Sequence, residues 1–196
     1  MSGKFGDRLM YIGGQFVPGH SGQWVESVNP GTEEVHGRVP VGTVEDVHKA
    51  VLAAEAAQPA WAETTIWERR DLLRKLGACM QARAAEIVPL EAADTGNTIA
   101  SLGRDVEVAA NYLDLFSGYG TELKGASVPT SKDGIHFSIR EPYGVVARIV
   151  PFNHPFLFAA AHLAAPLLAG NTVIVKAAEQ APLSAPSSRC CSLRHV

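Results

Sequence analysis

Residues 145–176, VVARIVPFNHPFLFAAAHLAAPLLAGNTVIVK, carry the clearest indication of the topology of the chain. This stretch opens with an apolar run at Val145–Val150, which predicts a strand buried on both faces, as in a parallel sheet. Pro155–Ala169 begins with a proline and is followed by a glycine, and it predicts a helix whose last turn Pro166 disturbs. A second apolar run at 171–176 predicts a second strand. Strand, helix and strand in this order predict a right-handed βαβ unit.

Two capping boxes predict helices earlier in the chain. Thr43 is followed three residues later by an aspartate and Thr65 by a glutamate, so each threonine is expected to cap the start of a helix. We expect Pro89 to break or kink the second helix, and Gly96-Asn97 to end the turn of helix that follows. Apolar residues three or four positions apart predict a third helix, from about 101 to a glycine at 118 or 120.

Short strands are predicted on both sides of these helices. Tyr11–Val17 and Trp24–Val28 are aromatic and β-branched runs separated by PGHSGQ, which predicts a hairpin between them. In Ile135–Arg140, apolar and polar residues alternate, which predicts a strand with one solvent-facing side. The chain is therefore expected to be α/β, with a helical N-terminal half followed by a parallel βαβ unit.

The composition is that of a globular chain. Its 196 residues contain 17 Lys and Arg against 20 Asp and Glu, a net charge of −3, and 46% are hydrophobic. This balance excludes disorder and gives no electrostatic support for nucleic-acid binding. The most apolar stretch, 155–170, is interrupted by His162 and Pro166 and is too short to cross a bilayer, so no membrane association is expected. The N-terminus lacks the apolar core of a signal peptide, which predicts a cytoplasmic location.

The cysteines indicate neither a disulfide framework nor a metal site. Cys79 lies within a predicted helix and is expected to be a small core residue. Cys190 and Cys191 are adjacent and lack the spacing of metal ligands, so they are expected to be exposed thiols.

Polar residues follow both strands of the βαβ unit. Pro151–His154 comes after the first strand, and Lys176–Glu179 ends the second. Ligands of such sheets bind outside the carboxyl ends of the strands, so these two segments are the candidate site. The first strand-to-helix turn contains no G-x-G-x-x-G sequence, which argues against the ordinary Rossmann mode of phosphate binding.

Each residue of this edge has two interpretations. Asn153 either caps the following helix or donates its amide to a developing oxyanion. Lys176 and Glu179 form either a solvent-exposed ion pair or a pair of groups that hold the hydroxyls of a ribose. Phe152 is either a core residue or a ligand contact. Composition and spacing leave these alternatives open.

Several segments, in order, resemble the N-terminal part of an aldehyde dehydrogenase. The resemblance runs from about Tyr11 to Ala185 and depends on the joint occurrence of the segments rather than on any one of them. They are YIGGQFV, SVNPGTEEV, PAWAETTIWERRDLLRKLG, EAADTGNTIASLGRDV, REPYGVVARIVPFNHP and LAAPLLAGNTVIVKAAEQAPLSA. The resemblance implies an incomplete Rossmann-like parallel sheet of the aldehyde dehydrogenase type.

The resemblance implies roles for the residues at the predicted edge. Asn153 matches the family's oxyanion-stabilising asparagine. Lys176 matches the lysine on the adenosine ribose, and Glu179 an acid associated with the ribose hydroxyls. Because an acid there repels a 2′-phosphate, NAD is expected rather than NADP. The remaining residues of the implied cofactor site, on its nicotinamide side, are Ile149, Val150, Pro151 and Phe152.

The resemblance also implies an organisation and a reaction. Residues 1–185 are expected to be a partial N-terminal cofactor-binding domain, with 135–141 as an oligomerisation strand, so that complete members form homo-oligomers. Residues 186–196, PSSRCCSLRHV, depart from the family and are expected to be an aberrant, unstructured tail produced by a frameshift or misassembly.

The implied reaction is oxidation of a small aldehyde to a carboxylic acid with NAD(P), without metal. The family's nucleophilic cysteine motif and its glutamate segment do not occur in this sequence, so the chain is expected to be inactive alone. The alternative function is a catalytically inactive nucleotide-binding or subunit-interaction module, and a non-functional translation product is a third possibility.

Overall fold

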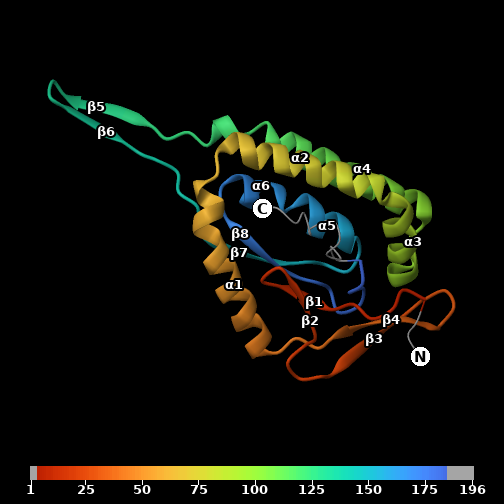
Figure 1. Cartoon of the computed structure of the whole chain (residues 1–196). Helices are drawn as coiled ribbons and strands as arrows, with labels where there is room; N and C mark the ends of the chain where they lie inside the picture. Colours follow the sequence, from red (N-terminus) through yellow and green to blue (C-terminus); the bar gives the residue numbers. More distant parts are fainter. Residues whose placement is uncertain (1–3, 185–196) are drawn as a thin grey trace.

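The computed structural model describes residues 4–184 of the chain. Helices cover one side of a parallel pair of strands, two N-terminal hairpins lie below the pair in this view, and a third hairpin projects away from the body (Figure 1). The elements in chain order are β1 (Met10–Ile12), β2 (Gln15–Val17), β3 (Trp24–Val28), β4 (Val35–Pro40), α1 (Val44–Glu63), α2 (Ile66–Ala82), α3 (Ala84–Thr95), α4 (Ile99–Ser117), the 3-10 turn η1 (Gly120–Glu122), β5 (Ser127–Ser131), β6 (Gly134–Phe137), β7 (Val145–Ile149), α5 (Pro155–Ala161), α6 (Ala164–Leu168) and β8 (Thr172–Lys176).

The βαβ unit is present, with one difference from the prediction. Strands β7 and β8 pair in parallel, as expected. The connecting helix, however, is divided into α5 and α6, with the interruption at His162 and Leu163. Pro166 lacks an N–H and its ring clashes with the carbonyl four residues earlier, which is that of His162. The disturbance therefore falls one turn earlier than the last turn of the helix.

The predicted helix caps are confirmed. The Thr43 hydroxyl accepts from the Asp46 N–H, and the Asp46 side chain accepts from the Thr43 N–H. Thr65 and Glu68 make the same reciprocal pair at the start of α2. The helix α4 ends against Gly118, one of the two expected positions.

The prediction that Pro89 breaks or kinks the second helix is wrong, because α2 ends at Ala82, before Pro89 is reached. The break occurs at Arg83, between α2 and α3, and Pro89 lies inside α3. Its neighbours Val88 and Leu90 are buried, so packing against the core maintains the helix despite the missing hydrogen bond. Gly96 ends α3 as expected, in the left-handed conformation with φ 78°.

The predicted pairing of the N-terminal strands is also wrong. The Tyr11–Val17 segment, together with Met10, forms both β1 and β2, which pair with each other, and β3 pairs with β4, a strand not expected from the sequence. Gly13 and Gly14 both have positive φ, 59° and 78°. Two-residue hairpin turns require positive φ at their central residues, so the chain reverses at Gly13-Gly14. The first hairpin is therefore complete before Trp24–Val28.

The hairpin of β5 and β6 extends into solvent (Figure 1). Its second strand ends at Phe137, short of the predicted Ile135–Arg140. The expectation of one solvent-facing side is wrong, because the apolar side is exposed as well: Ile135 is 68% and Phe137 75% accessible. Ile139, beyond the strand, is 67% accessible.

The core lies between α2, α3, α4, α5 and α6. Apolar faces at helical spacing supply it, and the side chains concerned are almost fully removed from solvent. Its members are Leu73, Leu76, Met80, Val88, Leu102, Val106, Ala109, Leu113, Phe156, Ala160, Ala161, Ala164 and Leu168, with Cys79 packed against them. The interpretation of Cys79 as a small residue of the core region is thereby confirmed.

One buried cation joins α1, α2 and α6. Arg69 is 7% accessible. Its guanidinium donates to the Leu168 carbonyl at 2.9 Å, to the Ala62 carbonyl at 3.3 Å, and to the Thr64 carbonyl. Burial lowers the pKa of Arg69, although Glu68 opposes this effect. Main-chain carbonyls at helix ends, rather than a buried carboxylate, therefore hold the charge.

Between residues 4 and 184, no helix has the length and the apolar character needed to cross a membrane.

Candidate functional site

The two segments predicted to form a site meet at the carboxyl ends of β7 and β8. Ile149 pairs directly with Lys176 in the parallel register. The next N–H, that of Val150, donates to the Lys176 carbonyl at 3.0 Å. Because the strands end level with each other, the residues after β7 and those after β8 lie at one edge.

Lys176 and Glu179 form the ion pair that was one of the two interpretations. Lys176 Nζ lies 3.3 Å from Glu179 Oε1. The side chains are 53% and 83% accessible, so the pair contributes little to stability. The ammonium and the carboxylate both remain open to a ligand, with one as donor and the other as acceptor.

Apolar side chains at the same edge are unusually exposed. Ile149 is 75% and Phe152 60% accessible, whereas Val150 between them is 4% accessible. The core interpretation of Phe152 is therefore wrong. Pro151 is exposed as well. The edge thus presents an apolar surface beside a charged pair, a combination that suits a ligand with a flat ring and hydroxyl groups.

Asn153 does not cap the helix that follows it. The N-cap of α5 is His154, with φ −144°, and it makes no side-chain capping bond. Asn153 is exposed, and only its backbone carbonyl is engaged, by Asn97 Nδ2 at 2.7 Å. The capping interpretation is therefore wrong, and within the described residues the side-chain amide of Asn153 has no hydrogen bond.

The segment that carries Asn153, called here the Asn153 loop (residues 150–156), is held by residues that no sequence pattern indicated. His154 Nδ1 lies 2.7 Å from Asp105 Oδ2, on α4. The Phe156 N–H donates to Glu91 Oε1, on α3, at 3.1 Å. These partners are 49 and 65 residues apart in sequence. No local pattern could have paired them.

Glu91 is a buried acid at the base of this loop. It is 1% accessible. Its pKa is raised from the ordinary 4.5 to about 8, chiefly by burial; the Phe156 N–H opposes this rise, and the neighbouring Asp105 and Asp94 contribute to it. Glu91 is therefore largely protonated and neutral at pH 7.

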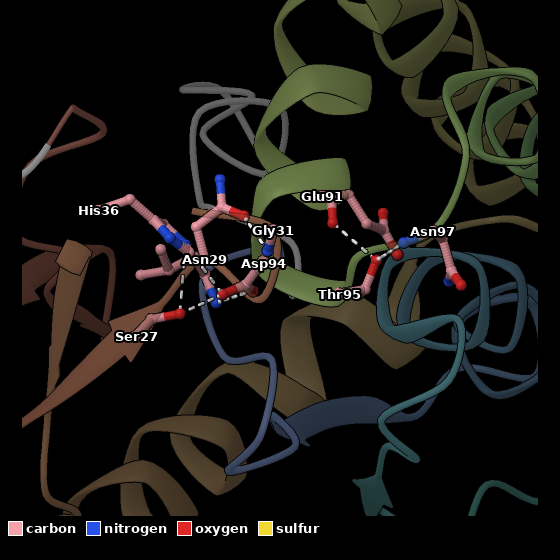
Figure 2. Close-up of polar contacts among 9 residues, drawn as sticks. Ser27, Asn29, Gly31, His36, Glu91, Asp94, Thr95 and Asn97 are labelled. Carbon is pink, nitrogen blue, oxygen red and sulfur yellow. Dashed lines mark hydrogen bonds and ion pairs between the residues drawn. The ribbon is translucent and has the colours of Figure 1, made fainter. Parts of the chain in front are cut away.

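A second buried cluster surrounds Asp94, near the end of α3 (Figure 2). Asp94 accepts from the Ser27 hydroxyl at 2.5 Å and from the Leu183 N–H at 2.7 Å, and lies 3.4 Å from His36 Nε2. It therefore joins β3, β4 and the segment after β8. Ser27 donates directly to Asp94 and is 4% accessible, so its hydroxyl is not placed for nucleophilic attack.

Some predictions concern residues that the structure does not describe. Cys190, Cys191 and the expected tail 186–196 lie outside residues 4–184.

Comparisons with known proteins establish the family. The sequence matches the model of the aldehyde dehydrogenase family over residues 16–191. The chain therefore belongs to the aldehyde dehydrogenase family, as its sequence resemblance implied. The fold agrees, since the α/β arrangement matches solved aldehyde dehydrogenases.

Individual relatives show how much of such a protein the chain represents. It is 44% identical over 162 residues to aldehyde dehydrogenase tropH of Talaromyces stipitatus, covering 81% of this chain and 32% of that protein. It is 38% identical over 179 residues to lactaldehyde dehydrogenase of Escherichia coli, covering 90% of this chain and 37% of that protein. The chain thus spans about a third of the length of these relatives.

A solved structure gives the same proportion. The NAD+ complex of an aldehyde dehydrogenase from Bacillus cereus matches with a TM-score of 0.87 and 35% identity. That match covers 91% of this chain and 37% of the other.

Proposed function

We propose that the edge formed by Ile149–Asn153 and Lys176–Glu179 is part of the cofactor and substrate site of an NAD(P)-dependent aldehyde oxidation. The observation that carries this proposal is the direct pairing of Ile149 with Lys176. It brings an exposed apolar surface, an accessible ion pair and an uncommitted asparagine amide to one edge of the sheet. Each of these matches one chemical part of the reactants.

The cofactor side of the proposal concerns two kinds of contact. Ile149, Pro151 and Phe152 would pack against the nicotinamide ring, with the buried Val150 as support. Lys176 would donate to the ribose hydroxyls and Glu179 would accept from them. The bound cofactor supplies the acceptor for the hydride that leaves the aldehyde carbon.

The substrate side concerns Asn153. As a nucleophile adds to a small aldehyde, negative charge develops on the carbonyl oxygen, and a preorganised amide N–H stabilises that charge. Asn153 is suited to this role because it is exposed and its amide has no hydrogen bond among residues 4–184. The product of the complete reaction is a carboxylic acid.

We further propose NAD rather than NADP as the cofactor. The carboxylate of Glu179 would accept from ribose hydroxyls but would repel a 2′-phosphate in the same place. Structures with either cofactor exist among the relatives, including the NAD+ complex of the Bacillus cereus enzyme and an enzyme from Escherichia coli described as NADP-dependent. The choice therefore depends on residues such as Glu179 rather than on the fold.

For the chain itself we propose nucleotide binding without turnover, in the cytoplasm. The cysteine and glutamate motifs of the family are not found in its 196 residues. A subunit-interaction role is the second candidate, and it is favoured by the exposure of Ile135 and Phe137 on the projecting hairpin. Complete members would then form homo-oligomers through residues 135–141.

Calorimetric titration of the purified chain tests the nucleotide proposal. Saturable binding of NAD, weaker binding of NADP, and a smaller difference between the two in Glu179→Gln are expected. Glu122→Gln is the matched control, because Glu122 forms a similar exposed pair with Lys124 in another part of the chain. Absence of NAD binding would overturn the proposal. NADH formation from a panel of aldehydes would contradict the expectation that the chain alone is inactive.

A further inference from the structure

The Asn153 loop has few hydrogen bonds of its own. Pro151 and Pro155 have no N–H, so two of its backbone donors are missing. Val150 is bonded to Lys176 at one end, and the Phe158 N–H bonds to the His154 carbonyl at the other. The residues between these points depend on other elements for their conformation.

Three polar side chains supply that support from one side. Asn97 Nδ2 donates to the Asn153 carbonyl at 2.7 Å. Asp105 Oδ2 lies 2.7 Å from His154 Nδ1, and Glu91 Oε1 accepts from the Phe156 N–H at 3.1 Å. Asn153, His154 and Phe156 are thus each held by a different side chain.

The supporting residues are themselves well fixed. Glu91 is 1% and Asp105 8% accessible. The Thr95 hydroxyl donates to the Glu91 carbonyl at 2.8 Å and accepts from the Asn97 N–H at 3.1 Å, as Figure 2 shows. Thr95 therefore links the main chain of Glu91 to that of Asn97, which fixes the backbone from which the Asn97 side chain reaches the Asn153 loop.

The other side of the loop is open. Pro151, Phe152 and Asn153 are exposed, while Phe156 is 3% accessible and belongs to the core. The loop is therefore anchored at its backbone and at its helical end, and its exposed residues include the amide assigned to the substrate. This asymmetry suits a segment whose backbone must be rigid while one side chain stays available.

We propose that three side chains act as positioning residues that fix the Asn153 loop, so that the Asn153 amide is presented to the substrate carbonyl; this inference rests on the proposed function. They are Glu91 on α3, Asn97 between α3 and α4, and Asp105 on α4. None of them touches the proposed reactants. They act through the backbone at 153 and 156 and through the ring of His154.

Hydrogen–deuterium exchange of the full chain tests the proposal. Asn97→Asp replaces the donor with a carboxylate oxygen that cannot donate to the Asn153 carbonyl. Exchange in residues 150–158 is expected to become about tenfold faster, since one hydrogen bond is lost from a locally opening segment. Exchange in α1 and α2 is expected to stay unchanged. Asn111→Asp, the same chemical change at an exposed position on α4, is the control.

A second pair of variants tests Glu91. Glu91→Gln keeps an acceptor for the Phe156 N–H and should preserve the protection of that amide, whereas Glu91→Ala should lose it. Unchanged exchange in 150–158 for Asn97→Asp would overturn the proposal. Equal acceleration in α1 and α2 would also overturn it, because the residues would then support the whole fold and not the loop.

The exchange result is independent of the nucleotide result. If the wild-type chain fails to bind NAD, the proposed function fails, and loop protection in the variants still reports on positioning. If NAD binds and loop protection is unaffected by Asn97→Asp, the positioning role fails while the proposed function stands.

Discussion

Replacing Glu91 by glutamine should make the stability of the protein much less sensitive to alkaline pH. Burial raises the pKa of Glu91 from 4.5 to about 8 in the folded chain. The folded state therefore holds a proton that the unfolded state releases as the pH rises above 4.5. The contribution of Glu91 to stability is fully present below the unfolded pKa and is lost progressively as the pH rises to the folded pKa.

The size of the effect follows from the two pKa values. Each tenfold change in proton affinity corresponds to about 1.4 kcal/mol, so the wild type should lose about 5 kcal/mol from this group between pH 4.5 and about 8. This is comparable to the whole free energy of unfolding of a small domain, about 5–15 kcal/mol. Glu91→Gln cannot ionise, and it retains an acceptor for the Phe156 N–H.

Urea unfolding of both proteins from about pH 5 to about pH 9 measures the difference. Other titrating groups are common to both, so they cancel in the difference between the two free energies. The variant should gain on the wild type as the pH rises. Glu107→Gln, at an exposed position on α4, is the control and should follow the wild type. A constant difference between wild type and Glu91→Gln across this range would show that the pKa of Glu91 is not raised in the folded chain.

Three further predictions concern stability, each measured by urea unfolding at neutral pH. Arg69→Met should cost about 3 kcal/mol, because it leaves buried carbonyls at helix ends without a donor, while Arg74→Met, which removes an exposed pair, should cost less than about 1 kcal/mol. Leu113→Ala should cost about 2–5 kcal/mol, because Leu113 is fully buried, and Leu115→Ala on the same helix, 54% accessible, should cost far less. Gly103→Ala should stabilise the protein by about 0.5–1 kcal/mol, since it lies inside α4 with open space at the position of a Cβ. Equal effects in the first two pairs, or a destabilised Gly103→Ala, would contradict these assignments.

Local patterns predicted the elements whose causes are local. The caps at Thr43 and Thr65 were predictable because donor and acceptor lie within four residues. The parallel strands were predictable because two apolar runs joined by a helix bury both of their faces as strands of one parallel sheet. The division between α5 and α6 follows from Pro166, although its effect falls at His162, where the ring meets the carbonyl.

Local patterns did not predict which distant strands pair or which distant residues hydrogen-bond to each other. Trp24–Val28 carries the signal of a strand, but nothing in it shows that β4 rather than β2 is its partner. Glu91 and Asp94 look like ordinary acids of a helix, and only the tertiary structure places them against Phe156 and Leu183, 65 and 89 residues away. The spacing of apolar residues indicates which face of a helix or strand is buried, but it does not indicate which other element covers that face.

At the candidate site, the sequence predicted which residues lie together at the sheet edge, but it did not predict which side chains are exposed or which residue caps α5. The edge after β7 and β8 follows from topology, and Lys176 and Glu179 are found there as an exposed pair. Phe152, by contrast, is exposed, and Asn153 leaves the N-cap to His154. The loop before α5 is held at Asn153 by Asn97 and at His154 by Asp105, and these contacts come from residues 56 and 49 positions away, which no local pattern reports.

Backbone and side-chain amide NMR can map where NAD binds on the chain. Added NAD is expected to shift the signals of Ile149, Val150, Phe152 and Asn153 together with those of Lys176 and Glu179, and to leave the α2–α4 surface unchanged. Saturable shifts confined to other elements, or no shifts at all, would contradict the claim that the carboxyl edge of β7 and β8 is the nucleotide site.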